Sequence, residues 1–255
     1  MCTILIATRC ASECPFFVVA NRDESYARPA SAPALRSIEG MRVLAPRDER
    51  SGGTWLGLNE AGLFVAITNR FEVERRPHHR SRGELVWTSL GRSGVDEALE
   101  HVRGLSPTDY GGFHLLLADR TGAQVIWSDG TVFREEVLAP GYHALSERSF
   151  GAGPSKRLER LALRSAGWRE FDDALRAELI EAMAWRDAQE PFESTCVHMP
   201  ELGYGTRSST IVALGERVRF EHADGPPCEA HYESYDNELH ALALDEVDEA
   251  RGGRA

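Results

Sequence analysis

Apolar, β-branched runs that are joined by tight turns recur along the chain, and they constrain its fold more than any other feature. The turn-forming tetrapeptide Asn59-Glu60-Ala61-Gly62, for example, joins two such runs in the pattern of a β-hairpin. Strands are predicted on this basis at residues 3–8, 16–20, 54–58, 63–68, 113–118, 123–127, 131–135, 208–214 and 217–222. Strands connected by such short turns pair antiparallel.

Three stretches between these strands have helical periodicity. Residues 83–102, 155–166 and 172–185 carry apolar side chains about one helical turn apart, with charged residues between them. The order along the chain is therefore strands, helix, strands, helices, strands. This order predicts an α+β protein, in which segregated helices cover antiparallel sheet, rather than a parallel wound fold.

The bulk composition limits the domain organisation and the partners. With 255 residues, 42% of them hydrophobic, the chain can bury a large core, and we expect a single domain over residues 1–225. Residues 226–255 are rich in Pro, Glu and Asp and predict an acidic, loosely packed tail. The net charge of −11 argues against nucleic acid as a partner.

No apolar run is long enough to span a membrane, and no signal peptide is apparent, so we expect a cytoplasmic protein. The five cysteines are an odd number at irregular spacing, which argues against a disulfide framework. Cys10 and Cys14 are interpreted as ordinary thiols, and His198-Met199 lacks a haem-attachment motif. We therefore predict no metal and no cofactor.

Cys2 is the first candidate for chemistry, because it directly follows Met1 at the start of a predicted strand. A small second residue allows an aminopeptidase to remove Met1, which leaves Cys2 with both a thiol and a free α-amine. That amine titrates at about pH 8 in reference peptides, so it can accept the thiol proton and generate the nucleophilic thiolate. The alternative is a small buried residue that only begins a strand.

Polar residues at the ends of other predicted strands offer partners for Cys2. Arg22, in the tetrapeptide Asn21-Arg22-Asp23-Glu24, is a cation that favours a thiolate. Asn69 ends an apolar strand, where its amide can stabilise an oxyanion, and Arg207 can bind a carboxylate or phosphate. Each also has an ordinary structural alternative, namely a polar turn, a turn residue or a surface ion pair.

Several segments taken together resemble one protein family. They are Cys2, Asn21-Arg22-Asp23-Glu24, Arg28-Pro29, the run GGTWLGLNEAGLFVAITNR and the run VHMPELGYGTRSST. This combination is similar to the NRDE family, also called the transport and Golgi organisation protein 2 family, over about residues 1–222. That family in turn looks like a distant branch of the N-terminal nucleophile hydrolases, nearest to choloylglycine hydrolase and penicillin V acylase.

The resemblance implies a four-layer αββα sandwich in which the first strand places Cys2 in a cleft between two sheets. It implies that Cys2 is the nucleophile, that Arg22 with Asp23 or Glu24 positions its thiolate and amine, and that Asn69 donates to the oxyanion. The expected substrate-binding residues are Asn21, Arg70, Arg207 and Glu147.

Glu147 is a departure from the pattern of this group. NRDE-type sequences usually read Leu-Ser-Asn where this chain reads Leu145-Ser146-Glu147. An ionised carboxylate cannot donate a hydrogen bond and repels a developing oxyanion, so Glu147 counts against vigorous amidase turnover.

The sequence is compatible with two functions. The first is hydrolysis of an amide or thioester by Cys2. The second is a carrier without catalysis, since members of the family have been connected with haem trafficking and with lipid or acyl-CoA homeostasis. In both cases we expect a small amphipathic or anionic ligand, with haem as a cofactor only in the second. A basic loop at residues 75–82 and Arg207 are the expected contacts for an anionic group.

Overall fold

The computed structural model describes residues 2–10, 12–71, 79–165 and 173–244. In these residues the strands form two sheets of seven strands each, and all neighbouring strands pair antiparallel. The first sheet has the order β10 (Gly141–Leu145), β1 (Cys2–Thr8), β2 (Phe16–Ser25), β12 (Tyr204–Leu214), β13 (Val218–Ala223) and β14 (Glu233–Ser234), with β11 (His198–Met199) also paired to β12. The second has the order β3 (Ala30–Ile38), β4 (Met41–Asp48), β5 (Leu56–Asn59), β6 (Phe64–Asn69), β7 (Phe113–Ala118), β8 (Ala123–Ser128) and β9 (Phe133–Val137).

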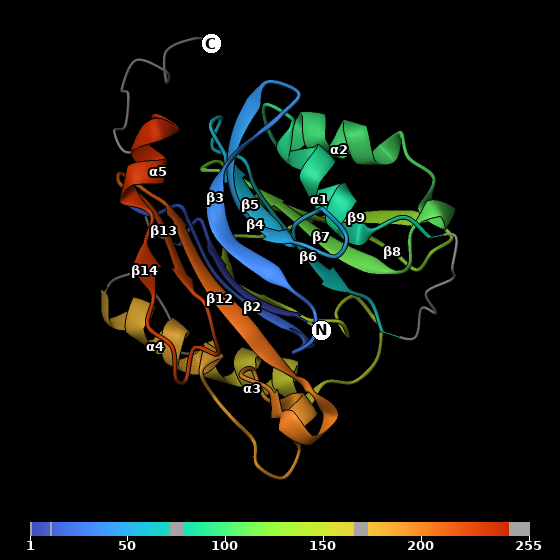
Figure 1. Ribbon diagram of the computed structural model, residues 1–255, viewed down its shortest axis with the longest axis vertical. Coiled ribbons are helices and arrows are strands. Elements are labelled where there is room, and N and C mark those ends of the chain that lie inside the picture. Colours follow the sequence, from blue (N-terminus) through green and yellow to red (C-terminus); the bar gives the residue numbers. More distant parts are fainter. Residues whose placement is uncertain (1, 11, 72–78, 166–172, 245–255) are drawn as a thin grey trace.

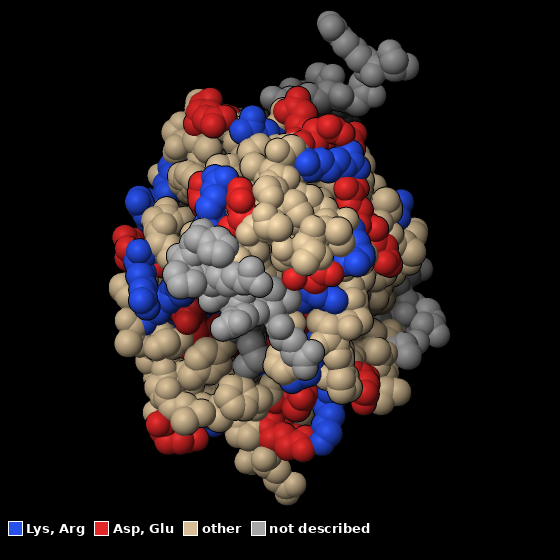
Figure 2. Space-filling view, turned by 90° about the vertical axis from the view of Figure 1, so that its right-hand side faces the viewer, with Lys and Arg blue, Asp and Glu red and all other residues tan. Residues whose placement is uncertain are grey.

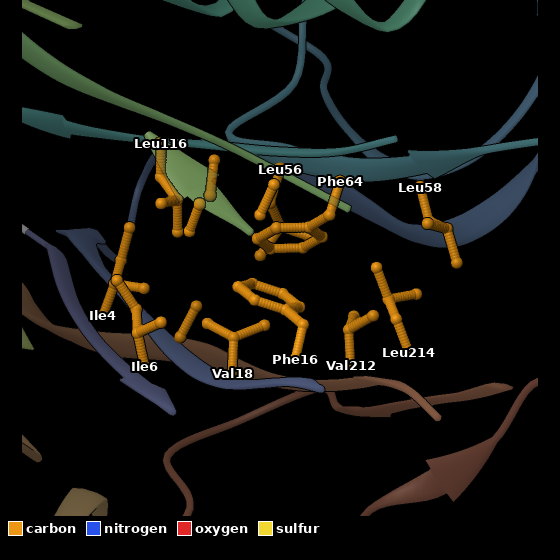
Figure 3. Close-up of a cluster of buried hydrophobic side chains, with 14 of the residues drawn as sticks. Ile4, Ile6, Phe16, Val18, Leu56, Leu58, Phe64, Leu116, Val212 and Leu214 are labelled. Carbon is orange, nitrogen blue, oxygen red and sulfur yellow. The ribbon is translucent and has the colours of Figure 1, made fainter. Parts of the chain in front are cut away.

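The two sheets pack face to face through one apolar core. Strict alternation along the strands places Ile4 and Ile6 of β1 and Phe16 of β2 on the same inner face. Phe16 meets Phe64 of the opposite sheet, with ring centroids 5.7 Å apart (Figure 3). The intervening residues of β1 and β2 point outward to a second apolar cluster beneath the helices.

Helices cover the outer faces of both sheets and complete four layers, as the resemblance implied (Figure 1). The second sheet carries α1 (Arg82–Leu90) and α2 (Val95–Arg103), and the first carries α3 (Lys156–Ser165) and α4 (Asp173–Met183). The single helix predicted at 83–102 is instead two helices. Gly91 caps the end of α1 and Gly94 caps the start of α2, so the chain turns between them.

Part of the C-terminal segment is packed, which corrects the expectation of a loose tail from residue 226. In the described residues, β14 adds to the first sheet and is followed by α5 (Asp236–Ala241). Leu239 and Leu242 are each only 1% exposed, because they close one end of the core between the sheets. Residues 245–255 lie outside the described residues, as do Met1 and residues 72–78, which include residues 75–78 of the predicted basic loop.

The helices of the described residues include none that combines the length and apolar character needed to cross a membrane. On the face shown in Figure 2, acidic and basic side chains lie interspersed rather than gathered by sign.

Candidate active site

A pocket of ≈ 280 Å³ opens at the end of the inter-sheet interface where β1 begins. All five residues predicted to be catalytic line it: Cys2, Arg22, Asp23, Glu24 and Asn69. They come from both sheets, since Asn69 ends β6 and the others lie on β1 and β2. The fold thus brings together residues that are up to 67 positions apart in the sequence, from Cys2 to Asn69.

Cys2 continues the inner face of β1. It lies two and four residues before Ile4 and Ile6 of the core, and it is paired with Arg22 on β2. Burial raises the pKa of the Cys2 thiol, and the negative charge of Asp23 raises it further. The Arg22 guanidinium and a backbone hydrogen bond from Asp23 act in the opposite direction. The thiol therefore needs a nearby base or cation to ionise at neutral pH.

Arg22 is held rigidly at the floor of the pocket. Its guanidinium carbon lies 4.2 Å from the centre of the Trp55 ring, and its Nη2 lies 3.3 Å from Asp48 Oδ2. The side chain is 5% exposed. A stacked, ion-paired arginine keeps its position without a ligand, so its charge is fixed beside Cys2.

Asp48 connects the two arginines of this region. Its Oδ2 accepts a hydrogen bond from Arg28 Nε at 2.7 Å and also forms the ion pair with Arg22. Arg28 Nη1 in turn lies 3.3 Å from Glu24 Oε2. Glu24 is therefore ion-paired with Arg28 in the wall of the pocket.

Gly53, two residues before Trp55, lies where another backbone segment passes too close for any side chain. A Cβ on Gly53 would lie 2.4 Å from the backbone carbon of Gly83, closer than real atoms approach. The two backbones meet here because Thr54 N–H donates to Gly83 O at 3.2 Å. This contact seats the start of α1 against Trp55, so that Ser81, Arg82 and Gly83 also line the pocket.

Asp23 points to the opposite face of β2, toward the helices. Its Oδ1 accepts a hydrogen bond from Thr206 Oγ1 at 2.7 Å, and its Oδ2 lies 3.8 Å from Arg157 Nη1. Burial raises the pKa of the Asp23 carboxyl, and Arg157 opposes this rise. Asp23 is thus paired with the buried cation Arg157, on the side of β2 away from the pocket.

Arg157 was not identified from the sequence. It is the second residue of α3 and is only 1% exposed. Its Nη1 donates to Thr3 Oγ1 at 2.7 Å, and Nη2 donates to Phe192 O. No sequence pattern marks this arginine, because its partners lie on distant segments.

Asn21, predicted to bind substrate, does not line the pocket. Its Nδ2 donates to Met183 O at 2.9 Å and to Thr195 O at 2.7 Å, so the side chain joins β2 to the helical layer. Adjacent residues on a strand point to opposite faces, and Arg22 occupies the pocket face.

Arg70 and Arg207 also lie outside the residues that line the pocket. Arg70 is bonded to the 146–150 loop, with its Nη1 3.0 Å from Ser149 O and its Nη2 3.0 Å from Phe150 O. Arg207 sits at a β-bulge in β12 and donates to Tyr26 O at 2.7 Å. The structure thus gives both arginines backbone carbonyl partners in place of the predicted ligand contacts.

Glu147 likewise does not line the pocket. It is buried, and its Oε2 lies 3.7 Å from Arg157 Nη1. The carboxylate therefore faces the same arginine as Asp23 instead of the position expected for an oxyanion. The repulsion predicted for Glu147 is reduced by this pairing.

Comparison with known proteins places the chain in a family. Residues 1–224 match the family described as Transport and Golgi organisation 2. Two relatives are the Transport and Golgi organization protein 2 homologs of Bos taurus, 32% identical, and Homo sapiens, 30% identical. Each alignment covers 77% of this chain and 81% of the relative.

Solved structures share the fold at low sequence identity. Penicillin V acylase from Agrobacterium tumefaciens has a TM-score of 0.52 at 12% identity, covering 91% of this chain and 86% of that one. A variant of conjugated bile acid hydrolase from Clostridium perfringens has a TM-score of 0.56 at 11%, covering 91% and 96%. The N-acylethanolamine-hydrolyzing acid amidase ortholog of Caenorhabditis elegans also has 0.56 at 11%, covering 84% and 93%.

Three observations agree on the fold. They are the four layers, the position of Cys2 at the start of an inner strand, and these matches. The chain belongs to the Transport and Golgi organisation 2 family, and it has the fold of the N-terminal nucleophile hydrolases.

Proposed function

We propose that this protein hydrolyses a small polar amide or thioester, with Cys2 as the nucleophile after removal of Met1. The observation that carries the proposal is the meeting of Cys2, Arg22 and Asn69 from two sheets in one pocket. These are a nucleophile, a cation that favours its thiolate and an amide donor, which acyl transfer requires together. The enzymes of similar fold, which are named as acylases, hydrolases and amidases, support the same class of reaction.

The first step transfers the thiol proton of Cys2 to its own α-amine, directly or through water. The sulfur then attacks the carbonyl carbon, and the carbonyl π electrons move to oxygen. Asn69 Nδ2 donates a hydrogen bond to that oxyanion, and Arg22 holds the negative sulfur before attack.

The second half of the reaction returns the proton. The Cys2 ammonium protonates the leaving nitrogen or sulfur as its bond to the carbonyl carbon breaks, which leaves an acyl thioester on Cys2. A water molecule, deprotonated by the same α-amine, attacks this thioester. The carbon–sulfur bond then breaks, the ammonium returns the proton to the Cys2 sulfur, and the carboxylic acid is released.

The pocket lining points to a small and polar substrate. Charged side chains dominate it, and Trp55 and Ile67 are the large apolar residues among those that line it. A pocket of ≈ 280 Å³ lies just below the range of about 300–1,000 Å³ that is usual for ligand sites. This lining gives little support to the alternative of an apolar carrier site for haem or a lipid.

A hydrolysis assay tests the proposal. Protein whose mass confirms loss of Met1 is incubated with a panel of short N-acyl amino acids and acyl thioesters, and the released acid is measured. Cys2→Ala is expected to abolish turnover, and Asn69→Ala to reduce kcat about 10²- to 10³-fold. Cys14→Ala is the matched control, because this cysteine lies beneath the helical layer and not in the pocket.

Two results oppose the proposal. Turnover that survives Cys2→Ala would exclude Cys2 as the nucleophile. Saturable haem binding with a shifted Soret band, in protein that hydrolyses nothing on the panel, would favour the carrier function instead.

A further inference from the structure

Three metal-ligating side chains meet away from the Cys2 pocket. Cys196 Sγ lies 2.9 Å from Cys228 Sγ and 3.4 Å from His198 Nε2, and Cys228 Sγ lies 3.1 Å from the same nitrogen. The two cysteines are not bonded to each other. Two sulfurs and one imidazole nitrogen thus converge on a single point, although the sequence predicted no metal site.

Two separate segments position this cluster. Cys196 and His198 flank Val197 at the entry to β11, and alternation along an extended chain places both side chains on the same side. Cys228 comes from the turn after β13, where Glu229 N–H and Ala230 N–H both donate to Pro226 O. Cys196 is fully buried, whereas His198 and Cys228 are partly exposed, so one side of the cluster faces solvent.

We propose that Cys196, His198 and Cys228 bind a zinc-type divalent metal ion. The three ligand atoms lie 2.9–3.4 Å apart. Tetrahedral ligands at zinc bond lengths of about 2.0–2.3 Å lie about 3.5–3.8 Å apart, so a small outward shift of these side chains would make room for the ion. Two thiolates and one imidazole form a donor set that suits zinc, and the exposed side leaves the fourth position for water.

Glu229 supports this assignment, because it lies on the side of the His198 ring away from the two sulfurs. Its Oε1 lies 3.8 Å from His198 Nδ1, on the ring nitrogen that does not face the sulfurs. A carboxylate that faces the non-ligating nitrogen is the usual partner of a metal-bound histidine, because it fixes the orientation of the ring.

The site joins the segment before β11 to the turn after β13. Val197 N–H, within that segment, donates to Thr206 Oγ1 at 2.8 Å, and Thr206 donates in turn to Asp23. A bound metal would therefore brace the strands behind Asp23 without touching the pocket. We expect metal binding to raise the melting temperature.

Cobalt titration of the full chain tests the proposal. The protein is reduced with a phosphine, stripped with a chelator and titrated with Co²⁺ as the probe. We expect about one cobalt per chain, with thiolate-to-cobalt absorption in the near ultraviolet and tetrahedral d–d bands that Zn²⁺ abolishes. Cys228→Ser should weaken binding at least about 10-fold and reduce the thiolate absorption, whereas Cys10→Ser should change neither.

Circular dichroism establishes that both variants are folded before the titration. The proposal is overturned if the reduced wild-type protein binds no cobalt, if the spectrum lacks thiolate bands, or if folded Cys228→Ser gives the wild-type spectrum. It is also overturned if the two cysteines form a disulfide in the isolated protein and the reduced protein takes up no metal.

Discussion

The two ends of the β1–β2 pair use the same inner face for opposite purposes. Toward one end, Phe16 is buried against Phe64 of the second sheet. At the other end, the same alternation presents Cys2 and Arg22, and the interface opens into a pocket. The comparison teaches that the apolar end stabilises the sandwich, while the charged end is positioned by it and contributes little stability of its own.

The largest difference is expected between substitutions at the two ends, in how far each lowers the free energy of unfolding. Phe64→Ala removes a fully buried ring from the apolar end and is expected to lower the free energy of unfolding by about 3–5 kcal/mol. Cys2→Ala, at the polar end, should lower it by less than about 1 kcal/mol. Denaturant unfolding of both variants measures the difference, and equal losses would contradict the division between the two ends.

The second prediction concerns the charges behind the pocket. Arg157→Met leaves Asp23 and Glu147 buried without their shared cation. We expect a loss of about 3 kcal/mol in the free energy of unfolding, because a buried charge is left uncompensated. Adding Glu147→Gln to this variant should restore part of the loss. If the double variant is no more stable than Arg157→Met, the pairing of these residues is not what Arg157 contributes.

The third prediction concerns a buried titratable group in the middle of the first sheet, where His222 pairs with Thr210 and Thr210 pairs with Ala20. Burial lowers the pKa of His222 to about 4, from an ordinary value of 6.5. Between these values the unfolded chain binds more protons than the folded one, so stability is constant above about pH 6.5 and falls as the pH drops toward 4. From pH 7.5 to pH 5 this histidine should account for a loss of about 2 kcal/mol.

His222→Gln should make unfolding less sensitive to acid by that amount, as measured by denaturant titrations at both pH values. The glutamine keeps a polar group near Thr210 Oγ1, which lies 2.8 Å from His222 Nδ1. An unchanged slope of stability against pH would show that the histidine is not the titrating group.

The smallest effect is expected at Arg207. Arg207→Ala removes a side chain bonded to Tyr26 O outside the pocket lining, so both kcat/KM and stability should change little, by about 0.5 kcal/mol or less. The measurement is hydrolysis by the purified variant beside the wild type. A large increase in KM would restore the ligand-binding role that the sequence predicted for this residue.

The sequence predicted the parts of the fold that local patterns determine. The hairpin around Asn59-Glu60-Ala61-Gly62 and the helix at 155–166 have clear periodicity, and both are confirmed by β5–β6 and α3. Strands β3 and β4 were missed, because β3 in particular mixes Ser, Arg and Pro with few buried residues. Their contribution to the site, Asp48, was missed with them.

Site residues that belong to sequence motifs could be predicted, whereas those positioned by tertiary packing could not. Cys2, Arg22 and Asn69 line one pocket, and each lies at or next to the end of a strand predicted from the sequence. Asn21 was predicted to bind substrate, although the two-residue period of the strand places it on the opposite face from Arg22. Arg157 depends on long-range packing, so no local pattern could have distinguished it from a surface arginine.

The most direct test compares acylation of Cys2 with its α-amine blocked and free. The protein is made with a cleavable N-terminal tag that ends directly before Cys2, and the same sample is assayed before and after cleavage. Intact mass after rapid quenching measures the formation of the acyl adduct from a thioester substrate. We predict that cleavage accelerates acylation about 10²-fold or more, since it supplies the general base. Equal rates in the two forms would contradict the account.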